Sequence, residues 1–167
     1  MKKIVKNLYS LTAIMILAAA VACNPTRRAA VAAANSDALS LGIASGKWKF
    51  IANEIMPQYG EARHSNGDYD VRFGKDTVMV YLPYFGKADG GANLLSEKGP
   101  LDFTSTNFTV DKKQNKKGQW LITFTPKDYR EVSTLNFTLS ATGYATLSAT
   151  MSNRTGISFS GTVVPIK

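Results

Sequence analysis

The sequence predicts an all-β fold, mainly an antiparallel meander of eight or nine strands that forms a barrel or a sandwich, with a short helix before it. From Lys47 to the C-terminus, apolar residues recur at every second position, as they do in half-buried strands. Turn residues separate these short runs, and no helical stretch between them is long enough for a parallel crossover. Because such a sheet has to protect its edges, it must close or fold on itself, and the sequence leaves barrel and sandwich open.

Residues 1–22 are typical of a lipoprotein signal peptide. A basic start precedes an apolar run of about fifteen residues, which is shorter than the roughly twenty that span a bilayer. The run ends in Ala20-Val21-Ala22-Cys23, which resembles a lipobox, so we expect Cys23 to be diacylated and to anchor the protein to a membrane. Removal of residues 1–22 takes away three lysines and no acidic residue, so the formal net charge falls from +8 to +5. Cys23 is the only cysteine, which excludes an intramolecular disulfide.

Residues 23–46 are predicted to contain the lipidated cysteine, a tether and a short helix. Alanine and leucine between about Arg28 and Ala44 favour a helix, and Gly46 is its expected C-terminal stop. For residues 24–34 we favour a disordered linker. A single antiparallel β domain of residues 47–167 follows.

The predicted strands share one pattern, in which apolar residues alternate with polar ones and face the core. The inward residues are Trp48, Phe50 and Ala52; Tyr69, Val71 and Phe73; Trp120, Ile122 and Phe124; Leu135, Phe137 and Leu139; Ala145, Leu147, Ala149 and Met151; and Ile157, Phe159 and Val163. Residues 77–82 are apolar on both faces, which indicates a central strand or one with a covered outer face. Short strands are expected at residues 101–104 and 107–111, and Gly161 marks a place where a bulge is tolerated.

The chain offers no catalytic constellation. His64 is the only histidine, which excludes a site built from several imidazoles, and we interpret it as a solvated loop residue. Asn66, Asp68 and Asp70 partly match the start of a calcium loop, but the position of the distal glutamate is Thr77. The sequence therefore predicts no catalytic residue, no metal site and no cofactor.

The candidate contact surface is the segment that follows Pro83, with Tyr84, Phe85, Lys87 and Asp89 as its residues. Aromatic faces at the end of a strand either line a ligand site or plug one end of the barrel or sandwich, and burial preferences favour the plug. A second feature is a positive patch that we interpret as a solvated hairpin tip, formed by Lys112, Lys113, Lys116 and Lys117.

Several short motifs resemble those of the Bacteroidetes lipoproteins grouped as domain of unknown function 4251. The resemblance covers residues 46–163 of the domain. It rests on the lipobox that ends at Cys23, the strand at 47–52, Tyr81-Leu82-Pro83-Tyr84-Phe85-Gly86, Lys116-Lys117-Gly118-Gln119-Trp120, Gly143-Tyr144-Ala145-Thr146-Leu147 and Arg154-Thr155-Gly156-Ile157-Ser158-Phe159-Ser160-Gly161. It implies an envelope lipoprotein and brings no activity. Asp76-Thr77-Val78 also resembles the O-glycosylation motif of that phylum.

The resemblance also implies a location: surface-export signals of that phylum place acidic residues directly after the lipidated cysteine, and none follows Cys23, so we expect an outer-membrane lipoprotein that faces the periplasm. We expect a non-enzymatic binding or structural module of the cell envelope. Its expected partners are the membrane, through the lipid, and an envelope glycan, a lipid or another envelope protein, but not nucleic acid. The alternatives are an inhibitor or accessory subunit of an envelope protein, or a hydrolase that uses His64 with Asp68 or Asp70.

Overall fold

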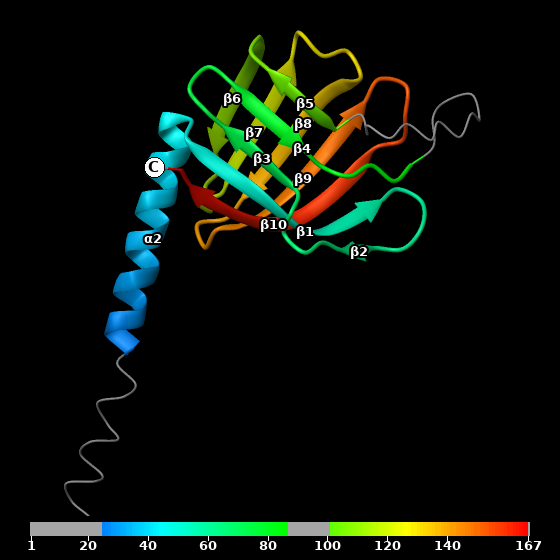
Figure 1. The fold of residues 1–167 in the computed structure, drawn as a ribbon. Helices are drawn as coiled ribbons and strands as arrows, with labels where there is room; N and C mark the ends of the chain where they lie inside the picture. Colours follow the sequence, from blue (N-terminus) through cyan, green and yellow to red (C-terminus); the bar gives the residue numbers. More distant parts are fainter. Residues whose placement is uncertain (1–24, 87–100, 167) are drawn as a thin grey trace, which may run out of the picture. The chain divides into compact units, whose positions relative to one another are not determined.

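The computed structural model describes residues 25–86 and 101–166, and the backbone alone for residues 25–33. Residues from Ser36 onward form one compact unit. In the described residues a helix precedes the strands (Figure 1), and the strands pair antiparallel, which confirms the mainly antiparallel β fold. The elements are α2 (Pro25–Ser45), β1 (Trp48–Pro57), β2 (Arg63–His64), β3 (Asp70–Phe73), β4 (Val78–Tyr81), β5 (Asp102–Ser105), β6 (Phe108–Gln114), β7 (Trp120–Pro126), β8 (Val132–Leu139), β9 (Tyr144–Met151) and β10 (Ile157–Pro165).

The strands of the described residues form a ten-stranded sheet in the order β5-β4-β3-β1-β10-β9-β8-β7-β6. The short strand β2 pairs with β1 beside this path, where the sequence predicts a loop. Both outermost strands, β5 and β6, come from one stretch of chain that only Thr106 and Asn107 interrupt. Because this one bent stretch supplies both edges, the sheet curls into a nearly closed barrel (Figure 1).

Asp128 fixes the bend between β5 and β6. Its carboxylate accepts hydrogen bonds from the Ser105 hydroxyl (2.5 Å), the Thr106 amide (2.8 Å) and the Asn107 amide (3.0 Å). These bonds, that from Ser105 first, lower the pKa of Asp128 to about 2. The ionised form of Asp128 is therefore the one that holds the bend between β5 and β6, which we call the seam of the barrel.

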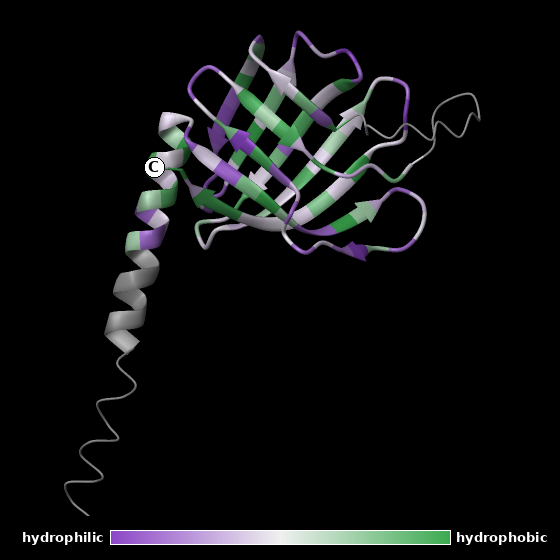
Figure 2. Cartoon of the chain, in the orientation of Figure 1, coloured by the Kyte–Doolittle hydropathy of each residue, from purple (hydrophilic) through white to green (hydrophobic). Residues whose placement is uncertain are grey.

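Aromatic side chains fill the centre of the barrel. The rings of Trp48 and Phe73 stack with centroids 4.0 Å apart, and Phe137 meets Trp48 edge-on at 5.2 Å. Figure 2 shows apolar and polar residues alternating along the strands. The predicted inward residues are buried, with Tyr69 and Trp120 partly so.

Of the two interpretations of residues 77–82, the central strand is confirmed, because β4 pairs with β3 on one side and with β5 on the other, whereas the covered outer face is wrong. Met79 and Tyr81 point outward and are 45% and 50% exposed. Tyr81 covers part of its ring against Tyr69, with the ring centroids 5.5 Å apart. A long side chain can thus follow an apolar pattern while half of its surface stays in water.

Gly161 lies opposite a bulge in the partner strand. The register between β1 and β10 shifts between Ala52 and Glu54, so the extra residue belongs to β1. A Cβ atom at Gly161 would overlap the carbonyl oxygen of Ile51. The glycine is therefore required by the close approach of β1.

Helix α2 begins at Pro25, so the interpretation of residues 25–34 as a linker is wrong. Proline is favoured at the first position of a helix, and the alanines after it have the highest helix propensity. The predicted stop is confirmed: Gly46 has φ of 73°, its amide bonds to the Ile43 carbonyl (3.2 Å), and the Lys47 amide bonds to the Gly42 carbonyl (2.8 Å). This is a Schellman motif. No helix among the described residues is both long and apolar enough to cross a membrane.

The C-terminal turns of α2 cover one end of the barrel, which we call the helix end. Leu39 and Ile43 are buried there. Lys112 lies on β6, not in the predicted loop, and its Nζ donates to the carbonyls of Ile43 (2.7 Å) and Ala44 (3.4 Å). Burial lowers the pKa of Lys112. The predicted positive patch is thus divided, because Lys112 caps the helix while the other three lysines are exposed.

Candidate functional site

The far end of the barrel, opposite α2, is formed by residues 58–62, 82–86, 127–131 and 152–156, which join the strands there. A groove of about 520 Å³ opens at this end beside β1, β9 and β10. It is lined by Met56, Pro57, Gln58, Ser148, Ala149, Thr150, Met151, Arg154, Gly156, Ile157 and Ser158. A volume of this size is typical of sites for small ligands.

Tyr84 and Phe85 fasten the segment 82–86 over the far end. Both are partly buried and pack against the core. The Tyr84 hydroxyl donates to the Thr155 carbonyl (3.0 Å) and lies 3.2 Å from Thr155 Oγ1. The Arg63 guanidinium lies 4.3 Å from the centre of the Phe85 ring, as in a cation–π contact. This arrangement matches the plug that burial preferences favour, while Lys87 and Asp89 lie outside the described residues.

Gly86 ends this segment for a steric reason. A Cβ atom there would overlap the Tyr84 hydroxyl and lie 2.6 Å from Thr155 Oγ1. The glycine therefore leaves room for the bond between Tyr84 and Thr155.

Arg154 is the charged side chain of the groove. Its side chain is only 18% exposed, and its guanidinium lies 5.7 Å from the centre of the Tyr84 ring. Among the described residues its nearest anion is Glu131, at 3.6 Å, which is an ion pair longer than a hydrogen bond. No hydrogen bond joins this guanidinium to another of the described residues, although it has five N–H donors. Donors of a largely buried cation are thus available at the groove.

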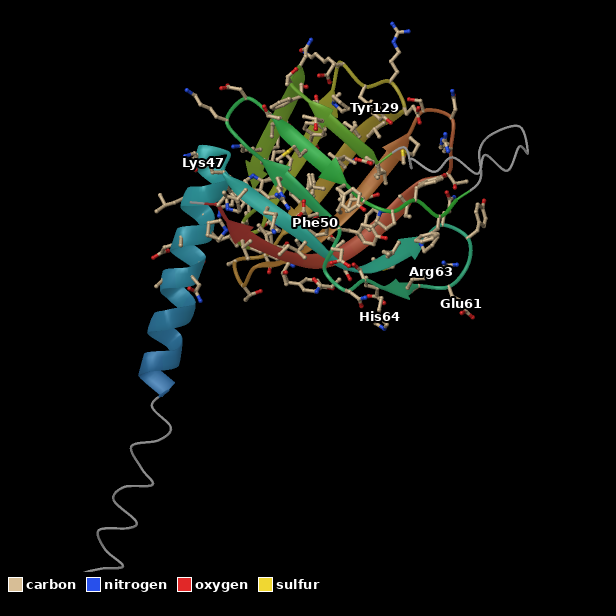
Figure 3. All side chains as sticks on the ribbon, viewed as in Figure 1. Lys47, Phe50, Glu61, Arg63, His64 and Tyr129 are labelled. Carbon is tan, nitrogen blue, oxygen red and sulfur yellow. The ribbon has the colours of Figure 1, made fainter. Side chains whose placement is uncertain are left out.

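Tyr129 supports this corner of the barrel. Its ring stacks on Phe103 with centroids 4.1 Å apart, and Figure 3 labels it among the side chains. Burial, and secondly the charge of Glu131, raise the pKa of Tyr129. The phenol is therefore neutral beside the pair of Arg154 and Glu131.

Three hydroxyl groups continue the groove along the outer face of β9 and β10. Ser158 faces Ser148 across the two strands, and Thr150 lies two residues further on the same face. Within the described part of the chain, none of these three hydroxyls makes a hydrogen bond to a protein group. Farther along the same face, polar side chains bond to one another, for example Thr123 to Asn136 at 3.0 Å. Thr138 and Thr146 also lack a hydrogen bond to the described residues, so the three hydroxyls of the groove are open to solvent rather than distinct from the rest of the face.

His64 is exposed on β2, and Figure 3 shows it on the outside of the hairpin. In the described residues, no hydrogen bond or ion pair joins it to Asp68 or Asp70. The Asp70 carboxylate instead accepts hydrogen bonds from Arg72 (2.9–3.1 Å) and lies 3.7 Å from Lys49 Nζ. The hydrogen bond and charge of Asp70 raise the pKa of Arg72. The geometry does not assemble the hydrolytic pair considered from the sequence.

No cluster of three or more potential metal ligands occurs in the part of the chain that the structure describes. Cys23, the expected lipidation site, lies outside the described residues. Sequence reasoning missed Arg154 and the three hydroxyls, because alternation tells which way a strand residue points but not which loops meet at one end. The available signal was a lone arginine in the turn between the last two strands.

Together, the barrel and the groove define a small antiparallel β protein with a ligand-sized site at one end. The family model described as domain of unknown function (DUF4251) matches residues 30–163, and the chain belongs to this family. It is similar to the crystal structure of a DUF4251 family protein from Bacteroides eggerthii DSM 20697, with a TM-score of 0.58 and 16% sequence identity. The match covers 80% of this chain and 89% of that chain, and it shows a shared fold. No curated protein matches the chain.

Proposed function

We propose that the protein is a lipid-anchored binding module of the cell envelope, without enzymatic activity, and that it holds its ligand in the groove at the far end. The observation that carries this proposal is Arg154, a largely buried guanidinium without a hydrogen bond to the described residues, in a groove of about 520 Å³. A buried cation is stabilised when an acceptor reaches it, and a ligand in the groove would provide one.

The binding test uses the protein purified in detergent and isothermal titration calorimetry against envelope glycans, lipids and fatty acids. Arg154→Gln removes the guanidinium, whereas Arg130→Gln removes an exposed arginine from the same end of the barrel and serves as the matched control. We expect Arg154→Gln to weaken binding by about 10- to 100-fold, as the loss of a charge-assisted hydrogen bond does. Equal affinity in both variants would place the ligand elsewhere.

The anchor is proposed from the sequence, through the basic start, the apolar run and the lipobox that ends at Cys23. The absence of acidic residues directly after Cys23 supports a position on the outer membrane, facing the periplasm. In the native host, the wild type should incorporate an alkyne-labelled fatty acid and sediment with outer membranes, and Cys23→Ser should do neither. Labelling of the serine variant would contradict the assignment. Digestion of the protein by protease on intact cells would overturn the inward orientation.

A further inference from the structure

The charge that the described residues bring to the groove is positive. Among the described residues that line it, Arg154 is the only charged one, and none of them is acidic. Glu131 offsets this charge only in part, because it lies 3.6 Å away and its side chain is 53% exposed. The groove therefore favours an anion, and a carboxylate fits the planar guanidinium with two parallel hydrogen bonds.

The rest of the lining favours a ligand that carries hydroxyl groups. Ser148, Thr150 and Ser158 offer hydroxyls without a partner among the described residues, and Gln58 adds an amide. An alkyl chain over these groups would remove them from water without replacing their hydrogen bonds, which is unfavourable. The lining thus argues against a fatty acid as the occupant.

The remaining lining residues are apolar and lie beside the polar ones. Met56 and Pro57, at the end of β1, are partly exposed and form the apolar wall, whereas Ile157, at the start of β10, is buried. In register, Met56 faces Ser158, which in turn faces Ser148. An apolar wall next to a row of hydroxyls suits a sugar ring, which has C–H faces and hydroxyl edges.

We infer that the groove binds an acidic saccharide, with the carboxylate of a uronic acid on Arg154 and neighbouring sugar hydroxyls on Ser148, Thr150 and Ser158. This inference rests on the proposed binding function and names its ligand class. Glu131 then competes with the carboxylate of the ligand for the Arg154 guanidinium. The affinity for the saccharide therefore depends on how strongly Glu131 pairs with Arg154.

Calorimetry of the detergent-purified protein with tri-galacturonate and with galactotriose tests the inference. We expect the wild type to bind the acidic trisaccharide about 10- to 100-fold more tightly than the neutral one. Arg154→Gln should abolish this preference, and Arg130→Gln should keep it. Thr150→Val, which preserves the shape of the side chain, should weaken both trisaccharides by a few-fold.

A second variant, with the opposite expected effect on affinity, keeps the test informative if Arg154→Gln does not fold. Glu131→Gln removes the competing carboxylate, so it should tighten binding of tri-galacturonate and leave galactotriose unchanged. Equal affinity of the wild type for the two trisaccharides, or no effect of Glu131→Gln, would overturn the acidic ligand. If neither trisaccharide binds while a lipid or another envelope compound does so through Arg154, the inference fails and the proposed binding function stands. If nothing binds, both fail.

Discussion

Each end of the barrel has a cationic side chain, Lys112 or Arg154, and the two differ in the partners that they bond. At the helix end, Lys112 donates to the last carbonyls of α2, the nearer at 2.7 Å. At the far end, the closest partner of Arg154 is a carboxylate at 3.6 Å, and the groove adjoins it. Lys112 uses its ammonium to bond the end of α2, whereas Arg154 has N–H donors available for a ligand. Of these two cations, Lys112 should therefore contribute to stability and Arg154 to binding.

The largest expected loss of stability comes from Ile43→Ala, which leaves a cavity where α2 covers the barrel. Ile43 is fully buried, so the free energy of unfolding should fall by about 2–5 kcal/mol in urea. Leu41→Ala is the control on the same helix, because Leu41 is 70% exposed, and its change should stay within about 0.5 kcal/mol. Ligand affinity of the folded Ile43→Ala protein should equal that of the wild type, and a change would link the two ends.

The next effect is that of Asp128→Asn, which weakens the seam between β5 and β6. Because folding lowers the pKa of Asp128 from 3.8 to about 2, its contribution is complete above pH 4 and is lost as the pH falls towards 2. The wild type should thus lose stability over this range by more than Asp128→Asn does, measured by urea unfolding from pH 5 to pH 2. Asp68→Asn, at an exposed carboxylate outside the seam, is the control. Parallel pH profiles of wild type and Asp128→Asn would contradict the role of this carboxylate.

A smaller effect is expected from Lys112→Met, which keeps the aliphatic stem and removes the ammonium. The lost cap on the C-terminus of α2 should cost about 0.3–1 kcal/mol in thermal or urea unfolding. Lys113→Met, at an exposed lysine one residue further along β6, should cost less. If Lys113→Met cost more, Lys112 would not be the structural cation.

An effect on stability no larger than that of Lys112→Met is expected from Arg154→Gln, although it has the largest effect on binding. Its ion pair with Glu131 is long and partly exposed, so the free energy of unfolding should change by no more than about 1 kcal/mol. Equilibrium unfolding without ligand checks this value. A loss like that of Ile43→Ala would make Arg154 a structural residue and remove the contrast between the ends.

Much of the fold could be predicted because period-two alternation determines which residues face the core. Trp48, Phe50, Phe137 and Phe159 are buried as that pattern requires. Alternation is a property of one strand, however, and the choice of a barrel depends on pairing between distant strands. The bend at Thr106 and its fastening by Asp128 are contacts across more than twenty residues, which no local pattern contains.

The sequence predicted none of the residues that line the groove, and only the neighbouring Tyr84 and Phe85 stood out, where an apolar strand meets a proline and two aromatics. Their partners come from elsewhere in the chain: Arg63 lies on β2, and Thr155 lies in the turn before β10, which also holds Arg154. The same limit explains Lys112, which looks like one of four loop lysines until its bond to the Ile43 carbonyl is seen. A site formed where several loops meet needs the tertiary structure.

The central claim is that ligand binds at the far end, around Arg154. It is tested most directly by titrating the ¹⁵N-labelled protein with tri-galacturonate and following the backbone amide chemical shifts. The account predicts shifts at Met56 and Gln58, at residues 148–151 and at residues 154–158, with the amides around Ile43 and Lys112 unchanged. Shifts confined to the helix end, or none at residues 154–158 while binding saturates, would contradict it.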